Sequence, residues 1–142
     1  MQPVLLDTSV YITALRSGNG GALSVRLLGP EAPLWLSSVV LEELYAGAGE
    51  RELRAVERLE RDFERAQRIL VPNLGDWARA GKILARLASK YHYERIGQGR
   101  LTNDALIATS AGRQGIRVIT ANERDYRRLA EFTRFNWQVA DI

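Results

Sequence analysis

The chain has 142 residues, of which 46% are hydrophobic, so it is long enough to bury a core and is unlike a disordered chain. It contains no cysteine, which excludes a disulfide framework and a thiolate metal site. Twenty Lys and Arg against 17 Asp and Glu give a net charge of +3, which permits a polyanionic partner without requiring one. With no signal-peptide pattern and no apolar run that could span a bilayer, we expect a cytoplasmic protein and no membrane partner.

Apolar segments alternate with helical patterns along the whole chain. The first half predicts a strand at 3–6, a helix at 8–17, a loop at 18–21, a strand at 34–36, a helix at 39–47 capped by Ser37 and Ser38, and a helix at 50–68. The second half predicts a strand at 68–72, a helix that opens at Asp76, a loop at 97–100, a helix at 101–115, a strand at 116–120, a helix at 124–132 and a strand at 137–139. Strands separated by helices predict a single α/β domain over 1–142, with a parallel sheet covered on both faces.

Polar side chains follow two of the predicted strands. In open parallel sheets, ligands bind beyond the carboxyl ends of the strands. Asp7, Thr8 and Ser9 come directly after the first strand, and Thr120, Asn122 and Asp125 end or follow the strand at 116–120. We therefore expect these six residues to lie at one edge of the sheet.

Two further acidic residues belong to helices that start near the same edge. Asp104 is the one carboxylate in an otherwise apolar stretch, and Glu43 shares a helical face with Val39 and Val40. Glu42 lies about 100° round the helix from Glu43, so at most one of the two points toward this edge. We choose Glu43.

Four converging carboxylates repel one another, and a divalent cation relieves that repulsion. Carboxylates and water are the ligands of Mg²⁺ or Mn²⁺, and with no cysteine and only His92 the chain has little to offer zinc or iron. A hard cation held by acids, with positions open to water, is suited to phosphodiester hydrolysis.

Each acidic residue also has an ordinary structural interpretation. Asp7 is in place to cap the helix that follows it. Asp104 is in place to be a first-turn acid behind a cap at Thr102 or Asn103. Glu43 alone would be a solvated helix residue, and Asp125 would begin the last helix. The metal interpretation is preferred because all four acids are expected at one edge.

Four motifs give the chain a resemblance to a known family. It resembles the PIN-domain ribonucleases, and most closely the VapC-type toxins of toxin–antitoxin pairs. The motifs have the order and approximate spacing of that family: "LLDTSV" (5–10), "SSVVLEELYAG" (37–47), "LTNDALIA" (101–108) and "VITANERDY" (118–126). The family usually has Phe at the position of Tyr126, a difference that we expect to affect packing rather than chemistry.

The resemblance implies a three-layer α/β/α, Rossmann-like PIN domain with a mainly parallel sheet. It also implies a Mg²⁺- or Mn²⁺-dependent endoribonuclease that hydrolyses RNA phosphodiesters with a metal-activated water. Carried over residue by residue, it makes Asp7 and Asp104 metal ligands, while Glu43 and Asp125 act through water or at a second site. The supporting residues would be Thr8, Thr120 and Asn122.

Partners follow from the same resemblance. Family members form homodimers, and a cognate antitoxin places a segment across the active site, for which the apolar helical region 38–59 offers a surface. Basic residues that precede the Asp104 helix are candidates for contacts with RNA phosphates: Lys90, Arg95 and Arg100.

Two other functions are consistent with parts of the pattern. One is a non-catalytic RNA- or protein-binding module with the same fold, although four carboxylates oppose RNA binding unless a metal neutralises them. The other is a haloacid-dehalogenase-type phosphatase. That class needs a second acid where this chain has Ser9, and a lysine after a strand, which neither Lys82 nor Lys90 provides.

Overall fold

The computed structural model describes residues 2–16, 32–92 and 99–140, so the predicted loop at 18–21 lies outside the described residues. The described strands are β1 (Val4–Leu6), β2 (Leu34–Ser37), β3 (Ile69–Leu70), β4 (Arg117–Thr120) and β5 (Trp137–Val139). The described helices are α1 (Thr8–Arg16), α3 (Ser38–Gly47), α4 (Glu50–Arg65), α5 (Leu74–Tyr91), α6 (Gly99–Gln114) and α7 (Glu123–Leu129).

The five strands form one sheet in the order β3-β2-β1-β4-β5, and every described pair is parallel. The central strand β1 pairs on one side with β2, through Leu5 and Trp35, and on the other with β4, through Leu5 and Val118. From β1 the chain first builds outward through β2 and β3, and later returns to add β4 and β5. The strand order therefore reverses between β1 and β4, and the carboxyl ends of these two strands flank the crevice in which such sheets bind ligands.

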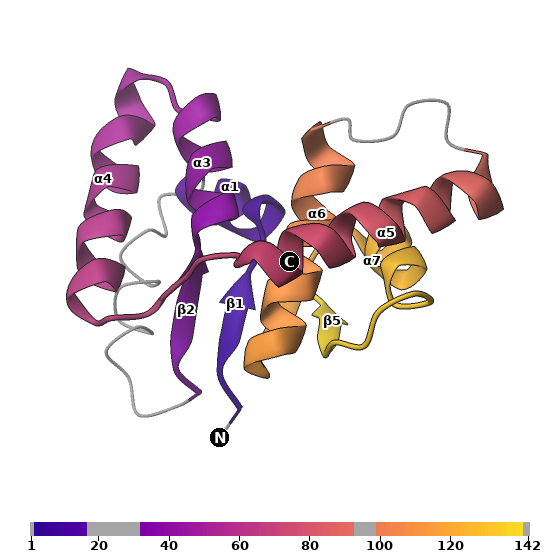
Figure 1. The fold of residues 1–142 in the computed structure, drawn as a ribbon. Coiled ribbons are helices and arrows are strands. Elements are labelled where there is room, and N and C mark those ends of the chain that lie inside the picture. The colour runs from indigo at the N-terminus through magenta and orange to yellow at the C-terminus, as the bar shows by residue number, and fades with distance from the viewer. Residues whose placement is uncertain (1, 17–31, 93–98, 141–142) are drawn as a thin grey trace.

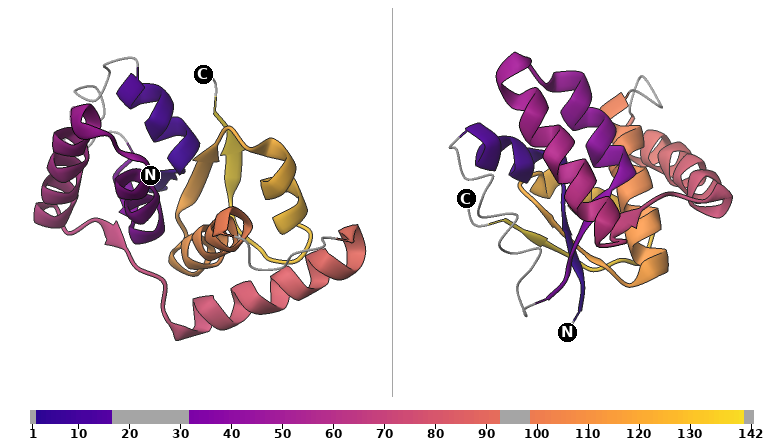
Figure 2. Two further views of the ribbon diagram at one scale, coloured as in Figure 1. Left: turned by 90° about the horizontal axis from the view of Figure 1, so that it is seen from above. Right: turned by 90° about the vertical axis from the view of Figure 1, so that its left-hand side faces the viewer.

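Helices cover both faces of the sheet, which gives the expected three layers (Figure 1). Figure 2 shows α1 and α6 on opposite sides of β4, and both helices contact this strand. Helix α5 packs along the outer side of α6. Helices α3 and α4 form a hairpin next to β2, at the end of the molecule away from α7. The predicted α/β class and parallel sheet are confirmed.

Local chemistry corrects three of the predicted helix boundaries. Helix α5 begins at Leu74, and Asp76 is the third helical residue, because Asn73 caps the helix and exchanges two hydrogen bonds with Asp76. Helix α6 begins at Gly99, inside the segment predicted as a loop. Helix α4 ends at Arg65, three residues early, because Gln67 takes a left-handed conformation with φ 57°.

A buried carboxylate joins α5 to α6, the helix that carries Asp104. The Asp76 side chain is fully buried and accepts hydrogen bonds at 2.9 and 3.1 Å from Nε of Arg113 on α6, and one at 2.5 Å from Arg79. The Thr109 hydroxyl of α6 also donates to the backbone carbonyl of Asp76, at 3.2 Å. These bonds fix the position of α6 across the face of α5.

Helix α6 also passes close to the segment that leads into β5. A Cβ atom on Gly112 would lie 2.7 Å from the backbone oxygen of Arg134, which is shorter than a normal contact. Glycine is therefore required here for space. No helix within the described ranges is long and apolar enough to cross a membrane.

Candidate active site

Asp7 stands at the carboxyl end of β1, buried with 4% of its surface exposed. Its Oδ1 accepts hydrogen bonds from the backbone and hydroxyl of Ser9, at 3.1 and 2.5 Å, and its Oδ2 accepts one from the Thr120 hydroxyl at the end of β4. The bond from the Ser9 amide caps α1, as the structural interpretation expected. The Thr120 bond comes from another strand, so capping does not account for the whole carboxylate. None of the ion pairs among the described residues involves Asp7.

Glu43 reaches the same edge from α3. Its Oε1 accepts a hydrogen bond of 2.6 Å from the Thr8 hydroxyl in the first turn of α1. Glu43 is half-buried, while Glu42 beside it is exposed, as the rotation of the helix requires. The chosen glutamate is therefore the one that faces α1.

Asp104 and Asp125 are bridged by one amide. The side-chain nitrogen of Asn122 donates to Oδ2 of Asp104 at 3.2 Å and to Oδ2 of Asp125 at 3.0 Å. Asn122 also caps α7, so the interpretation that Asp125 begins this helix is wrong; Asp125 is its third residue. The backbone amide of Asn122 donates to Thr120 Oγ1 at 2.9 Å, and the Thr120 hydroxyl in turn donates to Asp7. Asn122 is therefore linked to Asp7 as well as to the other two aspartates.

The position of Asp104 within α6 contradicts its structural interpretation. Because α6 begins at Gly99, Asp104 lies beyond the first turn, and Thr102 and Asn103 are interior residues rather than caps. Asp104 is 5% exposed and belongs to a run of buried residues. A carboxylate there gains little from the helix terminus and needs another reason to be buried.

The hydroxyl of Tyr126 lies against Asp104, which the sequence did not lead us to expect. Its fully buried hydroxyl donates a long, 3.5 Å bond to Oδ1 of Asp104, so the prediction that this tyrosine matters only for packing is wrong. Burial raises the pKa of Tyr126 well above the ordinary tyrosine value, and the negative charges of Asp104, Asp7 and Glu43 raise it further. Three of the predicted acids therefore act on one buried hydroxyl.

We call the four residues Asp7, Glu43, Asp104 and Asp125, with the hydroxyls and amide that hold them, the acidic edge. The four carboxylates would offer a metal ion only oxygen ligands, which suits Mg²⁺ or Mn²⁺. Among the described side chains, no three acids or histidines stand close enough to form a complete protein ligand set. An ion here would be held by one or two carboxylates together with water, which is the usual way that proteins bind Mg²⁺.

Ser9 is a further member of the acidic edge, although from the sequence we expected only its place after the first strand and no role. Its hydroxyl donates to Asp7 and accepts a 3.2 Å hydrogen bond from the backbone amide of Ala121, so it ties the end of β1 to the residue after β4. The one available signal was its position two residues after Asp7.

Of the three residues predicted to contact RNA, the structure describes the side chain of Lys90. Lys90 lies in the last turn of α5 and donates to Glu131. Arg95 lies outside the described residues, and Arg100 belongs to the first turn of α6. Both lysines of the chain are on α5, so the phosphatase alternative lacks its lysine at the strand ends.

The fold and the acidic edge together define an α/β domain whose carboxylates gather at the switch point of a parallel sheet. The family model described as the PIN domain matches residues 4–132. The chain therefore belongs to the PIN-domain family, and the resemblance carried by the four sequence motifs is confirmed.

Solved structures resemble the chain over nearly its whole length. VapBC-1 from nontypeable Haemophilus influenzae is 27% identical, with a TM-score of 0.63 over 97% of this chain and 98% of that chain. DNA-bound VapBC from Salmonella typhimurium is 24% identical, with a TM-score of 0.67 over 98% of both chains. VapBC2 from Rickettsia felis, bound to a DNA fragment from its promoter, is 20% identical, with a TM-score of 0.68 over 99% of this chain and 100% of that chain. No curated protein matches the chain.

Proposed function

We propose that the protein is a divalent-metal-dependent endoribonuclease and the toxin of a toxin–antitoxin pair. The observation that carries the proposal is the acidic edge: Asp7 and Asp104 are buried carboxylates, and hydrogen bonds through Thr120 and Asn122 link Asp7, Asp104 and Asp125. Burying like charges together is costly unless a cation or a proton compensates. Membership of the PIN family and the VapBC likenesses agree with a nuclease of this kind.

Asp7 and Asp104 would hold a Mg²⁺ or Mn²⁺ ion, with Glu43 and Asp125 acting through water or at a second position. The bound cation supplies a Lewis acid for the phosphodiester and favours ionisation of water. The chain's own contribution is orientation. Thr120 and Ser9 fix the two oxygens of Asp7 in different directions, and the Asn122 amide holds Asp104 and Asp125 in register.

An antitoxin partner is supported by a small cavity next to the acidic edge. It has a volume of about 100 Å³ and lies between α1 and the α3–α4 hairpin, within the helical region that the sequence favoured. Ile12 and Leu15 of α1 face Leu44 and Val56 of the hairpin across it, and Glu43 stands in its wall. An apolar side chain of an antitoxin placed here would bring its polypeptide next to Glu43.

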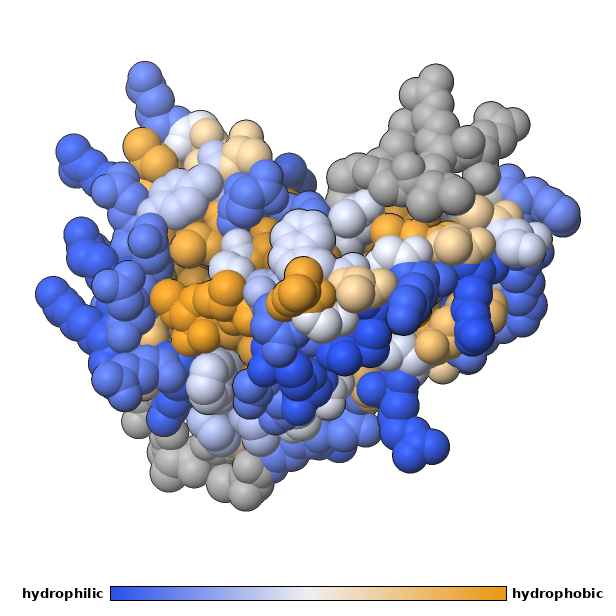
Figure 3. Space-filling model, in the orientation of Figure 1, coloured by the Kyte–Doolittle hydropathy of each residue, from blue (hydrophilic) through white to orange (hydrophobic). Residues whose placement is uncertain are grey.

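A homodimer is supported by apolar surface near the start of α5. Val71, Leu74 and Trp77 are 60%, 85% and 55% exposed, and Figure 3 shows apolar surface on this face of the molecule. Large apolar side chains that are exposed together on one surface favour a protein interface. Since the proposed substrate is cellular RNA, we propose that the protein acts in the cytoplasm.

The activity is tested by cleavage of labelled single-stranded RNA with Mn²⁺, Mg²⁺ or EDTA. Asp7→Asn and Asp104→Asn should abolish cleavage, and Glu43→Gln should lower it by about ten- to a hundredfold while Glu42→Gln leaves it unchanged. Glu42→Gln is the matched control because it makes the same chemical change one position along α3. Equal cutting by the wild type and Asp7→Asn would contradict the proposal.

Metal binding has a readout that does not require activity. Saturating Mn²⁺ should raise the thermal midpoint of the wild type, since a ligand at a hundred times its Kd stabilises by about 2.7 kcal/mol. Asp7→Asn should lose this shift while its metal-free midpoint stays the same or rises, because one repelling charge is gone. An equal Mn²⁺ shift in both proteins would place the ion elsewhere.

A further inference from the structure

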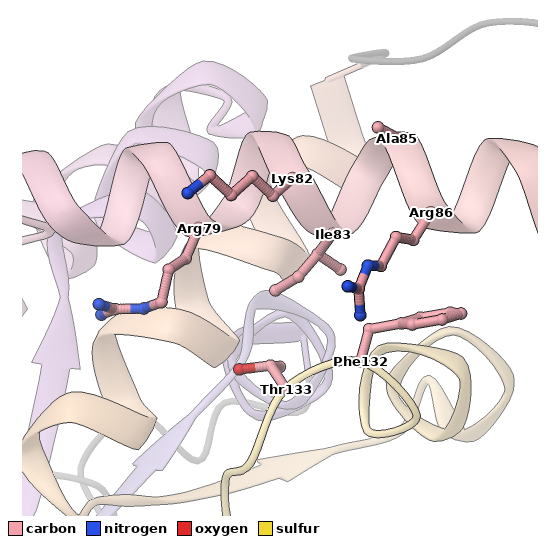
Figure 4. Close-up of a pocket in the computed structure, with 7 residues that line it drawn as sticks. All are labelled: Arg79, Lys82, Ile83, Ala85, Arg86, Phe132 and Thr133. Carbon is pink, nitrogen blue, oxygen red and sulfur yellow. The ribbon is translucent and has the colours of Figure 1, made fainter.

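A second concave site lies beside α5. It is a cavity of about 440 Å³ between α5 and the turn that follows α7, and we call it the α5 cavity. Figure 4 shows Ile83 pointing from α5 toward the turn, with Arg79 and Arg86 on either side of it and the Phe132 ring beneath Arg86. The seven residues that line it are Arg79, Lys82, Ile83, Ala85, Arg86, Phe132 and Thr133.

The cavity is positively charged. Arg79, Lys82 and Arg86 are separated by three and four positions, so one flank of α5 presents them as a row. No acidic residue lines the cavity. Arg79 is engaged by Asp76, but neither Lys82 nor Arg86 forms an ion pair with any residue in the described ranges. Two cations are therefore available to an anion.

The cavity also has a planar apolar wall. The Arg86 guanidinium lies 6.0 Å from the centre of the Phe132 ring, which is within the range of a cation–π contact. Ile83 is buried beneath, and the Thr133 hydroxyl faces the space. An aromatic ring and a guanidinium plane are the surfaces on which unpaired bases stack, and a hydroxyl suits a phosphate or a 2′-OH.

Helix α7 connects this cavity to the acidic edge. Asp125 lies in its first turn, and the turn after its last residue, Leu129, supplies Phe132 and Thr133 to the cavity. Seven helical residues span about 10 Å, a distance that a strand of a few nucleotides covers. A single strand lying along α7 would also pass the exposed side chains of Arg124 and Arg127.

We propose that the α5 cavity is a second binding site for single-stranded RNA, which holds one stacked nucleotide and its phosphates a few nucleotides from the acidic edge. This inference rests on the proposed function, in which the acidic edge is the site where RNA is cleaved. RNA fits better than an acidic peptide, because Phe132 and Arg86 offer a stacking surface that carboxylate side chains would leave unused.

The test is fluorescence anisotropy of a labelled oligouridylate long enough to span both sites, with EDTA present to prevent cleavage. The double variant Lys82→Ala/Arg86→Ala should weaken binding by about tenfold or more, because two cations that would contact phosphates are removed, and with Arg86 a stacking plane. The slope of log Kd against log salt should fall by about 1.4, since each phosphate contact of a single strand contributes about 0.7. The matched control is Arg54→Ala/Arg58→Ala, which removes two exposed arginines from α4 at the other end of the molecule and should bind like the wild type.

Cleavage assays separate this inference from the proposed nuclease. With Mn²⁺, the Lys82→Ala/Arg86→Ala protein should raise KM for the long RNA at unchanged kcat, and should cut a dinucleotide as the wild type does. Wild-type affinity in the double variant would overturn the inference and leave the nuclease intact. Loss of affinity in a protein that never cleaves would support the RNA site while the nuclease failed. Competition by polyglutamate as effective as that by RNA of equal charge would overturn it in favour of an acidic protein.

Discussion

Replacement of Asp76 by asparagine should lower the free energy of unfolding by about 3 kcal/mol. The carboxylate is fully buried and accepts bonds from Arg79, Arg113 and the backbone amide of Asn73. Breaking a buried ion pair on one side costs about 3–5 kcal/mol. We expect the lower end because the Arg113 and Arg79 side chains are 27% and 49% exposed, so water can restore part of their solvation.

The two arginines should not be equivalent. Arg113→Gln removes the cation that contacts both oxygens of Asp76 and should cost about 2 kcal/mol, in the range of hydrogen bonds to charged groups. Arg79→Gln removes a half-exposed partner three residues along the same helix and should cost about 1 kcal/mol or less. The expected order of destabilisation is therefore Asp76→Asn, then Arg113→Gln, then Arg79→Gln.

Urea unfolding followed by far-UV circular dichroism measures all three variants, at several protein concentrations so that self-association is recognised. A double-mutant cycle between Asp76 and Arg113 should give a coupling of about 1–3 kcal/mol. A loss below about 1 kcal/mol for Asp76→Asn, or equal losses for the two arginines, would refute the assignment of α6 anchoring to this pair.

Three other outcomes follow from the packing. Gly112→Ala should destabilise the protein by about 1–2 kcal/mol, because the clash with a backbone oxygen outweighs the gain in helix propensity. Gly81→Ala should stabilise it by about 0.5–1 kcal/mol, because the new Cβ meets nothing within 4 Å. Urea unfolding measures both changes. The hydrogen bond from Tyr45 to Glu60, aided by partial burial, raises the pKa of Tyr45 to about 12. In the unfolded chain the tyrosine ionises near pH 10, so between these values the folded protein keeps a proton that the unfolded chain loses. Stability should therefore fall as pH rises from 10 to 12, and Tyr45→Phe should flatten that decline in unfolding curves recorded across this range. Phe63→Ala should cost about 3–5 kcal/mol, because the side chain is 1% exposed in the core under α4, and a thermal melt that moved by only a degree or two would contradict this.

The positions of the strands and helices along the chain were predicted from the sequence because they depend on local patterns. The choice of Glu43 over Glu42 needed only the rotation of an α-helix, and the structure places Glu43 against Thr8. The end of α6 was signalled by Gly115, which has the left-handed φ of 69° that favours glycine. The start of α6 was missed because Gly99 stands in a glycine-containing segment that resembles a loop, and tertiary packing overrides such a weak local preference.

Contacts between residues far apart in the chain could not be predicted from the sequence. Asp76 and Arg113 are 37 positions apart, and nothing in their local sequence signals that a helix-capping aspartate also accepts a guanidinium from α6. The Tyr126 hydroxyl was assigned to packing because its bond to Asp104 depends on how α7 crosses α6. The acidic edge itself was predicted as a set, because the ends of parallel strands must meet. Which hydroxyl holds which oxygen required coordinates.

The strand order has a consequence for the timing of activity during synthesis. The acidic edge draws on β1, α3, α6 and α7, so its members are spread from Asp7 to Asp125 and come together only when β4 takes its place beside β1. A ribosome-bound chain that has not yet exposed Thr120 and Asn122 lacks the hydrogen bond from Thr120 to Asp7 and the bridge between Asp104 and Asp125. Under the proposed function, a nascent chain that stops before β4 would therefore not cleave RNA. Activity would appear only after β4 has folded beside β1, and by then the α3–α4 hairpin has already been synthesised.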